Sequence, residues 1–252
     1  MTLKEFFDEN RKVALAFSGG SDSSFLLYKA IQNGIDIKAY FVSTEFQPQF
    51  EVERAEKIAK DLNANFEVIF SNVMGFDSIT ENRDNRCYLC KKNIIREIKE
   101  KAEKDGYEVI IDGTNASDSM KERPGIQAGI EAGVISPLVV CGLKKDKIRQ
   151  MATEENAPAA LEPSYSCLAT RIRKSDRITL KKLAEIERVE IFLRNNGFGN
   201  FRFRISELKD NSEVGILEID RKDLSKLARV RNALLSDFAG DFDRFAVDLK
   251  FR

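Results

Sequence analysis

The segment 13–30 places the strictest limits on how this chain can fold. A short apolar run at 13–17 is followed by Ser-Gly-Gly-Ser-Asp-Ser-Ser at 18–24 and then by an apolar stretch at 25–30. The first run has the length of a buried strand, and the last is typical of a helix. The two glycines let backbone N–H groups approach a ligand, and the helix dipole favours negative charge at the first turn. The segment therefore predicts a strand, an anion-binding loop and a helix.

The chemistry of this loop suits a phosphate group. Serine hydroxyls donate to phosphate oxygens, and Asp22 can hold Mg²⁺ between them. No Gly-Lys-Ser/Thr follows, so the loop is not a Walker loop. It resembles the Ser-Gly-Gly-x-Asp-Ser loop of the PP-loop ATP pyrophosphatases, which binds the pyrophosphate that leaves when a substrate is adenylated. The alternative is a serine-rich turn that only caps a helix. The residues that the resemblance assigns to ATP are Ser18, Gly19, Gly20, Ser21, Asp22 and Ser23.

An alternation of strands and helices continues to about residue 156. Amphipathic runs with one apolar face, such as 52–62 and 94–102, lie between apolar segments of strand length. Strands separated by helices predict an α/β fold with a doubly wound parallel sheet, in which ligands bind at the carboxyl ends of the strands. The strands are expected at 13–17, 37–42, 66–70, 107–111 and 137–140.

The rhythm changes after this region. Residues 157–178 contain two prolines and little periodicity, so we expect an active-site loop or linker there. We expect 1–156 to be the PP-loop ATP pyrophosphatase domain and 179–252 to be a small α+β domain for substrate binding or oligomerisation. The elements expected in the small domain are helices at 180–194 and 220–238 and strands at 201–206, 213–219 and around 244–249.

The composition excludes several classes of function. Histidine is absent, which removes the commonest general base and the commonest metal-binding imidazole. Lys plus Arg and Asp plus Glu each number 41, and this neutral balance argues against a nucleic acid partner. No apolar run has the length of a membrane span, and no signal-peptide pattern opens the chain, so we expect a cytoplasmic protein. Cysteines in such a chain indicate metal or redox chemistry rather than disulfides.

Three of the four cysteines have the spacing of metal ligands. Cys87 and Cys90 form a Cys-x-x-Cys pair at the start of a predicted helix, and Cys167 lies in the long loop. Cys141 ends an apolar run and is expected to be a small core residue. Three cysteines without histidine fit a 4Fe–4S cluster with one open iron. A structural zinc site, which would have to recruit Cys141, and cysteines without any metal are the alternatives.

Motifs along most of the chain match one family. They are the loop at 16–23, Asn-Arg-Cys-Tyr-Leu-Cys-Lys at 85–91, Asp-Gly-Thr-Asn at 112–115, Asp118, Arg-Pro-Gly at 123–125, Ser-Pro-Leu at 136–138, Cys-Leu-Ala-Thr-Arg-Ile at 167–172, and the pair Arg202 and Arg204. Together they resemble the LarE family of ATP-dependent sulfur transferases, which serve nickel-pincer cofactor synthesis. The resemblance implies an enzyme that uses ATP and Mg²⁺ to adenylate a carboxylate of a pyridinium mononucleotide and then replaces oxygen by sulfur.

The resemblance also bears on the source of the sulfur. In some members the cysteine that matches Cys167 is consumed as the donor, whereas members with three cysteines carry a 4Fe–4S cluster that receives sulfide or sulfur from another donor. The presence of Cys87, Cys90 and Cys167 implies the cluster type, and the family also implies a homo-oligomer. The chain departs from the family pattern at Glu162-Pro163, at 173–175 and at its C-terminal end, which leaves the exact sulfur acceptor open.

The remaining candidate residues lie at the end of one strand and in the small domain. A second ATP-binding group follows strand 107–111, with a turn capped by Asp118 as the alternative; it consists of Gly113, Thr114, Asn115 and Asp118. Alternation along 201–206 puts Arg202 and Arg204 on one face and Phe201, Phe203 and Ile205 on the other. The pair suits a substrate phosphate, with a solvated face as the alternative. Asp220 is expected to cap its helix. The catalytic candidates are Asp22, Cys167, Arg202, Arg204 and either Glu187 or Glu190, one of which matches a family glutamate.

The same sequence features also fit three other functions. Thiolation of tRNA could use the same cluster chemistry. An amide-forming ligase similar to NAD or GMP synthetases shares the loop but needs ammonia rather than cysteines. A regulatory protein that binds an adenine nucleotide, with structural zinc on its cysteines, is the alternative outside the enzymes.

Overall fold

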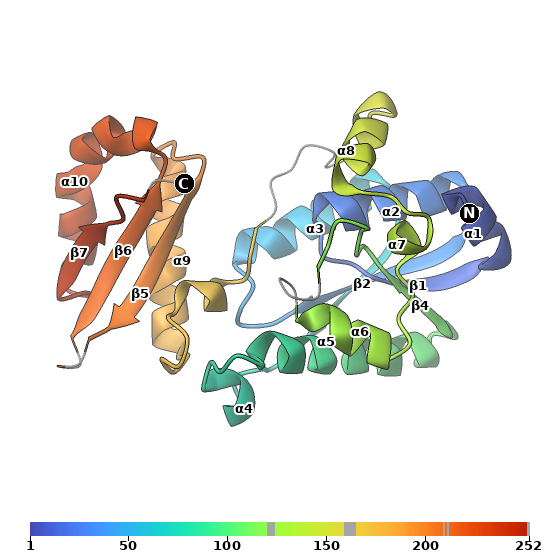
Figure 1. The fold of residues 1–252 in the computed structure, drawn as a ribbon, viewed down its shortest axis with the longest axis horizontal. Helices are drawn as coiled ribbons and strands as arrows, with labels where there is room; N and C mark the ends of the chain where they lie inside the picture. Colours follow the sequence, from blue (N-terminus) through green and yellow to red (C-terminus); the bar gives the residue numbers. More distant parts are fainter. Residues whose placement is uncertain (120–123, 159–164, 209, 211, 251–252) are drawn as a thin grey trace. The chain divides into compact units, whose positions relative to one another are not determined.

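The computed structural model describes residues 1–119, 124–158, 165–208, 210 and 212–250 (Figure 1). The chain forms two compact units, which are described one at a time. The first consists of 1–73 and 85–165, and the second of 74–84 and 166–252. Residues 74–84, expected in the first domain from the sequence, group with the second unit, and hydrogen bonds connect them to it. The Asn82 side chain donates to the carbonyl of Arg173 at 2.8 Å, and the Ile178 N–H donates to the carbonyl of Thr80 at 2.8 Å.

The first unit contains a four-stranded sheet in the order β3-β2-β1-β4, in which every neighbouring pair is parallel. Figure 1 shows helices on both sides of this sheet. The fold is therefore the α/β doubly wound class that the sequence predicts. Its strands are β1 (Lys12–Ala16), β2 (Asp36–Ser43), β3 (Asn65–Phe70) and β4 (Val109–Asp112); its helices are α1 (Leu3–Glu9), α2 (Ser21–Gln32), α3 (Gln49–Asp61), α5 (Arg86–Lys104), α6 (Gly125–Glu131), α7 (Pro137–Val140) and α8 (Lys145–Glu154).

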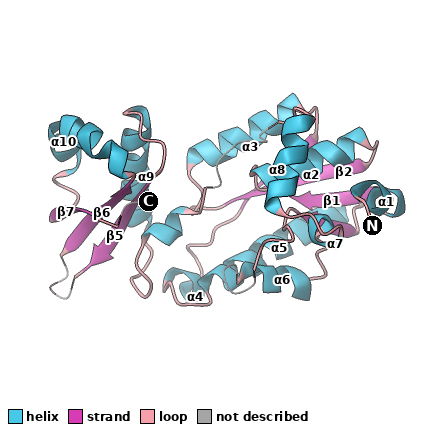
Figure 2. Ribbon diagram, turned by 45° about the horizontal axis from the view of Figure 1, so that its top comes forward, coloured by secondary structure: helices cyan, strands magenta, loops and turns pink. Residues whose placement is uncertain are grey.

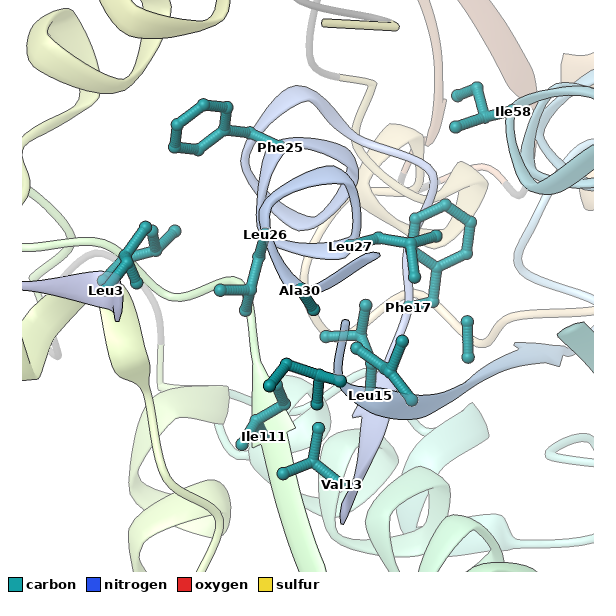
Figure 3. Close-up of a cluster of buried hydrophobic side chains, with 14 of the residues drawn as sticks. Leu3, Val13, Leu15, Phe17, Phe25, Leu26, Leu27, Ala30, Ile58 and Ile111 are labelled. Carbon is teal, nitrogen blue, oxygen red and sulfur yellow. The ribbon is translucent and has the colours of Figure 1, made fainter. Parts of the chain in front are cut away.

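Alternate residues of β1 contribute to two separate hydrophobic cores. Val13 and Leu15 belong to the core that α2, α3 and α8 cover, whereas Ala14 and Ala16 pack in the core formed with α5. In Figure 3, α2 places Leu26 and Ala30 over Val13, Leu15 and Ile111. A strand that is buried on both faces has to be apolar throughout, which explains the unbroken run at 13–17.

Two local expectations for the first unit are wrong. The segment 137–140 is the short helix α7 rather than a fifth strand, and only Ile135 bridges to Ile111 of β4. Pro137 has no N–H for a ladder hydrogen bond, but it is well suited to the first position of a helix. In addition, α2 begins at Ser21, so that the serines of the loop already form its first turn.

The second unit contains a three-stranded sheet in the order β5-β6-β7 and two long helices (Figure 2). The strands β5 and β6 are antiparallel, and β6 and β7 are parallel. Its α+β class and the ranges of its elements agree closely with the sequence prediction. The elements are α4 (Asp77–Thr80), the 3₁₀ helix η1 (Leu168–Arg171), α9 (Leu180–Asn195), β5 (Phe201–Glu207), β6 (Glu213–Ile219), the 3₁₀ helix η2 (Arg221–Asp223), α10 (Leu224–Phe238) and β7 (Arg244–Val247).

The core of the second unit lies between the sheet and α9. Phe203 and Ile205 of β5 are buried, and the ring of Phe203 packs edge-on against Phe242 at a centroid distance of 5.1 Å. The apolar stripe of α9 that packs in this core includes Leu183, Ile186, Val189 and Leu193. Across the described residues of both units, no helix has the length and apolar character needed to span a membrane.

Candidate functional site

The serine-rich loop connects the carboxyl end of β1 to the first turn of α2. Gly19 has φ +67°, and a β-carbon there would lie 3.1 Å from the Cβ of Ala55 on α3. Glycine is therefore required both by the backbone conformation and by the close packing of α3. Gly20 is the N-cap residue of α2, and its side-chain-free backbone leaves the first N–H groups of this helix available for an anion.

Hydrogen bonds between serines hold the loop in shape. The hydroxyls of Ser18 and Ser23 are 3.0 Å apart, and Ser23 donates to the carbonyl of Gly20 at 3.1 Å. The N–H of Gly20 points to the Ser18 hydroxyl at 3.4 Å. Hydrogen bonds of the Ser18 and Ser23 hydroxyls thus fix the conformation of the loop.

Gly113 brings the end of β4 against this loop. A β-carbon on Gly113 would lie 2.8 Å from both the Cα and the backbone N of Ser23, a distance that real β-carbons essentially never adopt. The two strand ends can therefore approach one another only because residue 113 is glycine. The sequence places Gly113 among the ATP-binding candidates, but this steric reason becomes visible only when β1 and β4 are neighbours.

Asn115 connects the two candidate ATP-binding segments through Asp22. The Asn115 side-chain nitrogen donates to the Asp22 carboxylate at 3.0 Å, and its side-chain oxygen accepts from the N–H of Ser117 at 2.8 Å. Asn115 is fully buried, so this amide has a fixed orientation. The Asp118 carboxylate accepts from the N–H of Asn115, three residues earlier, at 3.2 Å, and this bond closes the turn 115–118. The structure thus brings Asp22 and Asn115 together at one edge of the sheet.

Ser136, which was not among the candidate site residues expected from the sequence, also contributes to this edge. The Ser136 hydroxyl donates to the Asp112 carboxylate at 2.7 Å, and the Thr114 hydroxyl donates to the other oxygen of Asp112 at 2.9 Å. Asp112 is buried, so these donors compensate its charge and fix the turn that carries Thr114. The Ser-Pro-Leu motif was the available signal in the sequence.

Cys87 and Cys90 lie on the first turns of α5, three residues apart and so on one face of the helix. Both are half-buried, and the Arg86 guanidinium donates to the sulfur of Cys87 at 3.4 Å. None of the four cysteines, all of which are described, forms a disulfide.

The position of this pair follows from the direction of α5. At its C-terminal end Asp105 contacts Lys38 near the start of β2 at 2.6 Å, whereas Glu97 accepts from Ser71, just after the end of β3, at 2.7 Å. The helix therefore runs antiparallel to the strands. A rise of about 1.5 Å per residue then puts the two cysteines roughly 10–15 Å beyond the level of Glu97. The pair extends past the carboxyl edge of the sheet, where the ATP-binding candidates also lie.

The thiols of Cys87 and Cys90 could supply two of the ligands of a metal site. Among the residues that the structure describes, no group of three or more Cys, Asp or Glu side chains is arranged to hold a metal ion. Cys87 and Cys90 belong to the first unit and Cys167 to the second. Cys141 follows α7 and packs half-buried against the core of the first unit, where burial raises the pKa of its thiol. It has the surroundings of the core residue that the sequence predicts.

Cys167 is the N-cap residue of η1, and its backbone is tightly bonded. Its carbonyl accepts from the N–H of Thr170 at 3.0 Å and from the Thr170 hydroxyl at 2.8 Å. The neighbouring Arg171 is almost completely buried, at 1% exposure. One of its terminal nitrogens donates to the carbonyl of Ser166 at 2.7 Å and to the Thr170 hydroxyl at 2.8 Å.

Of the two candidate glutamates, Glu190 contacts this segment through Arg171. The Glu190 carboxylate accepts from the Nε–H of Arg171 at 2.9 Å and from the N–H of Phe203 at 3.1 Å. Glu187 is half-buried, almost one turn earlier on α9. No signal in the sequence indicated a buried ion pair between Arg171 and Glu190.

Arg202 and Arg204 alternate with buried residues of β5, as the sequence predicts, and both are half-buried. Arg204 forms an ion pair with Glu218 on β6 and donates to the carbonyl of Thr170 at 2.6 Å. Arg202 lies opposite Glu218 in the register of the two strands. Asp220 is the N-cap residue of η2, although its side chain makes no capping hydrogen bond and instead accepts from Asn200 at 2.8 Å. Arg123, Glu162 and Pro163 lie outside the described residues.

Comparisons with known proteins find a matching family and several relatives. The family described as "Thiamine biosynthesis protein (ThiI)" matches residues 8–193. An uncharacterized protein of Methanocaldococcus jannaschii is 34% identical over 236 residues, which cover 94% of this chain and 88% of the relative. An uncharacterized protein of a Synechocystis species is 35% identical over 206 residues, covering 80% and 76% of the two chains. The pyridinium-3,5-bisthiocarboxylic acid mononucleotide synthase of Lactiplantibacillus plantarum is 26% identical over 205 residues, covering 81% and 74%.

Proposed function

The chain belongs to the ThiI family and is an ATP-dependent sulfurtransferase of the PP-loop type, and we propose that it converts a carboxylate of a pyridinium mononucleotide to a thiocarboxylate. The substrate class comes from the named relative in Lactiplantibacillus plantarum. The observation that carries the proposal is the contact between the serine-rich loop and the end of β4, where Asn115 binds Asp22.

The first half of the reaction is activation by ATP. We assign the binding of the pyrophosphate part of ATP to the N–H groups of the first turn of α2 and to the hydroxyls of Ser18, Ser21 and Ser23. Asp22 lies in that turn and would hold Mg²⁺, which neutralises the charge that develops on the leaving pyrophosphate. Asn115 restrains the Asp22 carboxylate from the side of β4. Adenylation turns a poor leaving group, the carboxylate oxygen, into AMP.

The second half requires a source of sulfur. We propose that Cys87, Cys90 and Cys167 ligate a 4Fe–4S cluster, which would supply the sulfur atom that replaces the oxygen. The pair on α5 supports this proposal, because it presents two thiols from one helix face beyond the carboxyl edge of the sheet. Histidine is absent, so no imidazole of this chain competes with the thiolates as a ligand for iron.

Anaerobic purification followed by iron and sulfide analysis tests this assignment. We expect a brown protein with about four irons per chain. Cys87→Ala, Cys90→Ala and Cys167→Ala should each lose the iron, whereas the control Cys141→Ala should keep it. One zinc per chain and no iron would contradict the cluster. Product formed by iron-free protein, with loss of the mass of hydrogen sulfide at Cys167, would show a sacrificial cysteine instead.

For the substrate phosphate we propose Arg202 and Arg204, which share one face of β5. Arg204 already pairs with Glu218, so a bound phosphate would have to replace this carboxylate as its partner. Arg202→Ala and Arg204→Ala should weaken binding of the pyridinium mononucleotide much more than binding of ATP. Unchanged affinity for the substrate in both variants would favour the alternative, in which the two arginines only form a solvated face. Glu187 remains the candidate for a carboxylate that contacts the substrate.

We also propose that the protein is a homo-oligomer that takes its sulfur from sulfide or another sulfur donor. Light scattering coupled to size-exclusion chromatography measures the first property. Turnover with added sulfide, beyond one product per chain, measures the second. RNA that co-purifies with the protein and becomes thiolated in the same assay would favour a tRNA substrate over the mononucleotide.

A further inference from the structure

The ion pair of Arg171 and Glu190 is the most deeply buried pair of charges that the structure describes. The side chains are each 2% exposed, and the guanidinium Nε lies 2.9 Å from the carboxylate. Removing two charges from water costs several kcal/mol per ion, and the attraction between them often only balances this cost. A buried pair is therefore weak evidence for stability, and the role of this one lies in what it contacts.

Those contacts converge on the backbone around Cys167. Arg171 donates to the carbonyl and the hydroxyl of Ser166 at 2.7 and 2.8 Å and approaches the carbonyl of Cys167 at 3.5 Å. The same nitrogen donates to the Thr170 hydroxyl, which in turn donates to the carbonyl of Cys167. The guanidinium thus bonds to residues on both sides of the cysteine.

Glu190 fixes the other side of the guanidinium. Its carboxylate accepts from the N–H of Phe203, in the middle of β5. The path from β5 through Glu190 and Arg171 to Ser166 and Thr170 consists of hydrogen bonds shorter than 3.2 Å. The guanidinium of Arg204, also on β5, donates directly to the carbonyl of Thr170. The segment 166–170 is therefore anchored to the sheet of the second unit at two places.

We propose that Arg171, held by Glu190, is a positioning residue that fixes the Cys167 segment for sulfur transfer. The part that concerns sulfur transfer rests on the proposed function of Cys167, whereas the anchoring of the segment can be measured without any activity. Arg171 acts through the backbone of Cys167 and does not itself contact the reacting groups.

The test uses a double variant, because Arg171→Ala would leave the Glu190 charge buried without its partner. Arg171→Met with Glu190→Gln removes both charges together, and the glutamine oxygen still accepts from the N–H of Phe203. The matched control is Lys182→Met, which removes another buried charge from α9 that pairs with Glu207 and Glu213 rather than with the Cys167 segment.

The first measurement is the rate of alkylation of Cys167 in the reduced, metal-free full-length protein, followed by peptide mass mapping. Loss of hydrogen bonds to a charged group makes local opening easier, and we expect alkylation of Cys167 to become about tenfold faster or more in the double variant. Cys90 in the first unit serves as the internal reference and should react at the wild-type rate. In Lys182→Met both rates should match the wild type.

The second measurement separates positioning from mere stability. In the double variant we expect the rate of sulfur transfer to fall by about tenfold or more, with ATP–pyrophosphate exchange and the KM for ATP unchanged. Unchanged alkylation of Cys167, whatever the melting temperature does, would overturn the anchoring. Faster alkylation with wild-type sulfur transfer would overturn the role in catalysis. If the wild-type protein itself transfers no sulfur to the mononucleotide, the proposed function fails, and the alkylation rates still decide the anchoring.

Discussion

Gly113→Ala tests the contact between the two halves of the ATP site. The added β-carbon would lie 2.8 Å from the Cα and backbone N of Ser23 and 3.0 Å from its Cβ. Two of these atoms belong to the backbone of the first turn of α2, so the clash cannot be relieved by a side-chain rotation. Either the end of β4 or the turn that carries Ser23 has to move.

The expected cost follows from two opposing effects. Overpacking of this kind destabilises by about 1–3 kcal/mol. Alanine also restricts the unfolded chain, which returns about 0.4–1 kcal/mol. The net loss of about 1–2 kcal/mol corresponds to a melting temperature lower by about 2–8 °C for a chain of this size. Because the displaced groups include the N–H of Ser23, we expect ATP–pyrophosphate exchange to fall by about 10²-fold.

Gly129→Ala provides a matched control with the opposite sign. Gly129 lies within α6, and a β-carbon there would meet Ile95 and Val134 at 3.9 Å, an ordinary contact distance. Alanine is favoured over glycine inside a helix by about 0.5–1 kcal/mol, so this variant should be slightly more stable than the wild type. Thermal unfolding and isotope exchange from labelled pyrophosphate into ATP measure both variants. A Gly113→Ala protein with wild-type stability and exchange would refute the contact between β4 and the loop.

Three further substitutions of single residues test the proposed metal ligand, an ion pair and the core of the second unit. Asp22→Ala should lower ATP–pyrophosphate exchange by about 10²–10³-fold while the chain still folds, because its proposed task is to stabilise charge on the leaving group; near-normal exchange would remove Asp22 from the mechanism. Hydrogen bonds from the ammonium group of Lys38 and the hydroxyl of Tyr40 lower the pKa of Asp105 from 3.8 to about 2. The stability that this carboxylate contributes is therefore complete above about pH 4 and is lost as the pH falls towards 2. Urea unfolding should show this slope for the wild type and a flatter one for Asp105→Asn; equal slopes would contradict it. Gly215→Ala would place a β-carbon 2.5 Å from the ring of Phe203, and we expect amide exchange to accelerate in β5, β6 and β7 but not in β1 or β2; unchanged protection there would show that the ring can move aside.

Local patterns in the sequence were sufficient for most of the fold. The apolar run at 13–17 is buried on both faces, and the alternation at 201–206 matches the buried and half-buried faces of β5. Burial of this kind depends on the period of a segment, so it can be predicted before any neighbour is known. The segment 137–140 shows the limit, because an apolar run of strand length opens a helix when its first residue is proline.

For the candidate site, the sequence was sufficient to predict which residues could bind ATP. The order Ser-Gly-Gly-Ser-Asp-Ser predicts an anion-binding loop because glycine and a helix start are local properties of the backbone. The expected ATP-binding role of Asn115 likewise came from its motif.

Only the tertiary structure decided which distant residues meet. The neighbouring positions of β1 and β4 bring Gly113 to Ser23, and the packing of η1 on α9 closes the ion pair of Arg171 and Glu190. Neither contact has a periodic signature, because it depends on which elements become neighbours rather than on the spacing within one of them. The identity and spacing of residues therefore determined the chemistry available to this chain, whereas long-range packing determined which of those groups are held together.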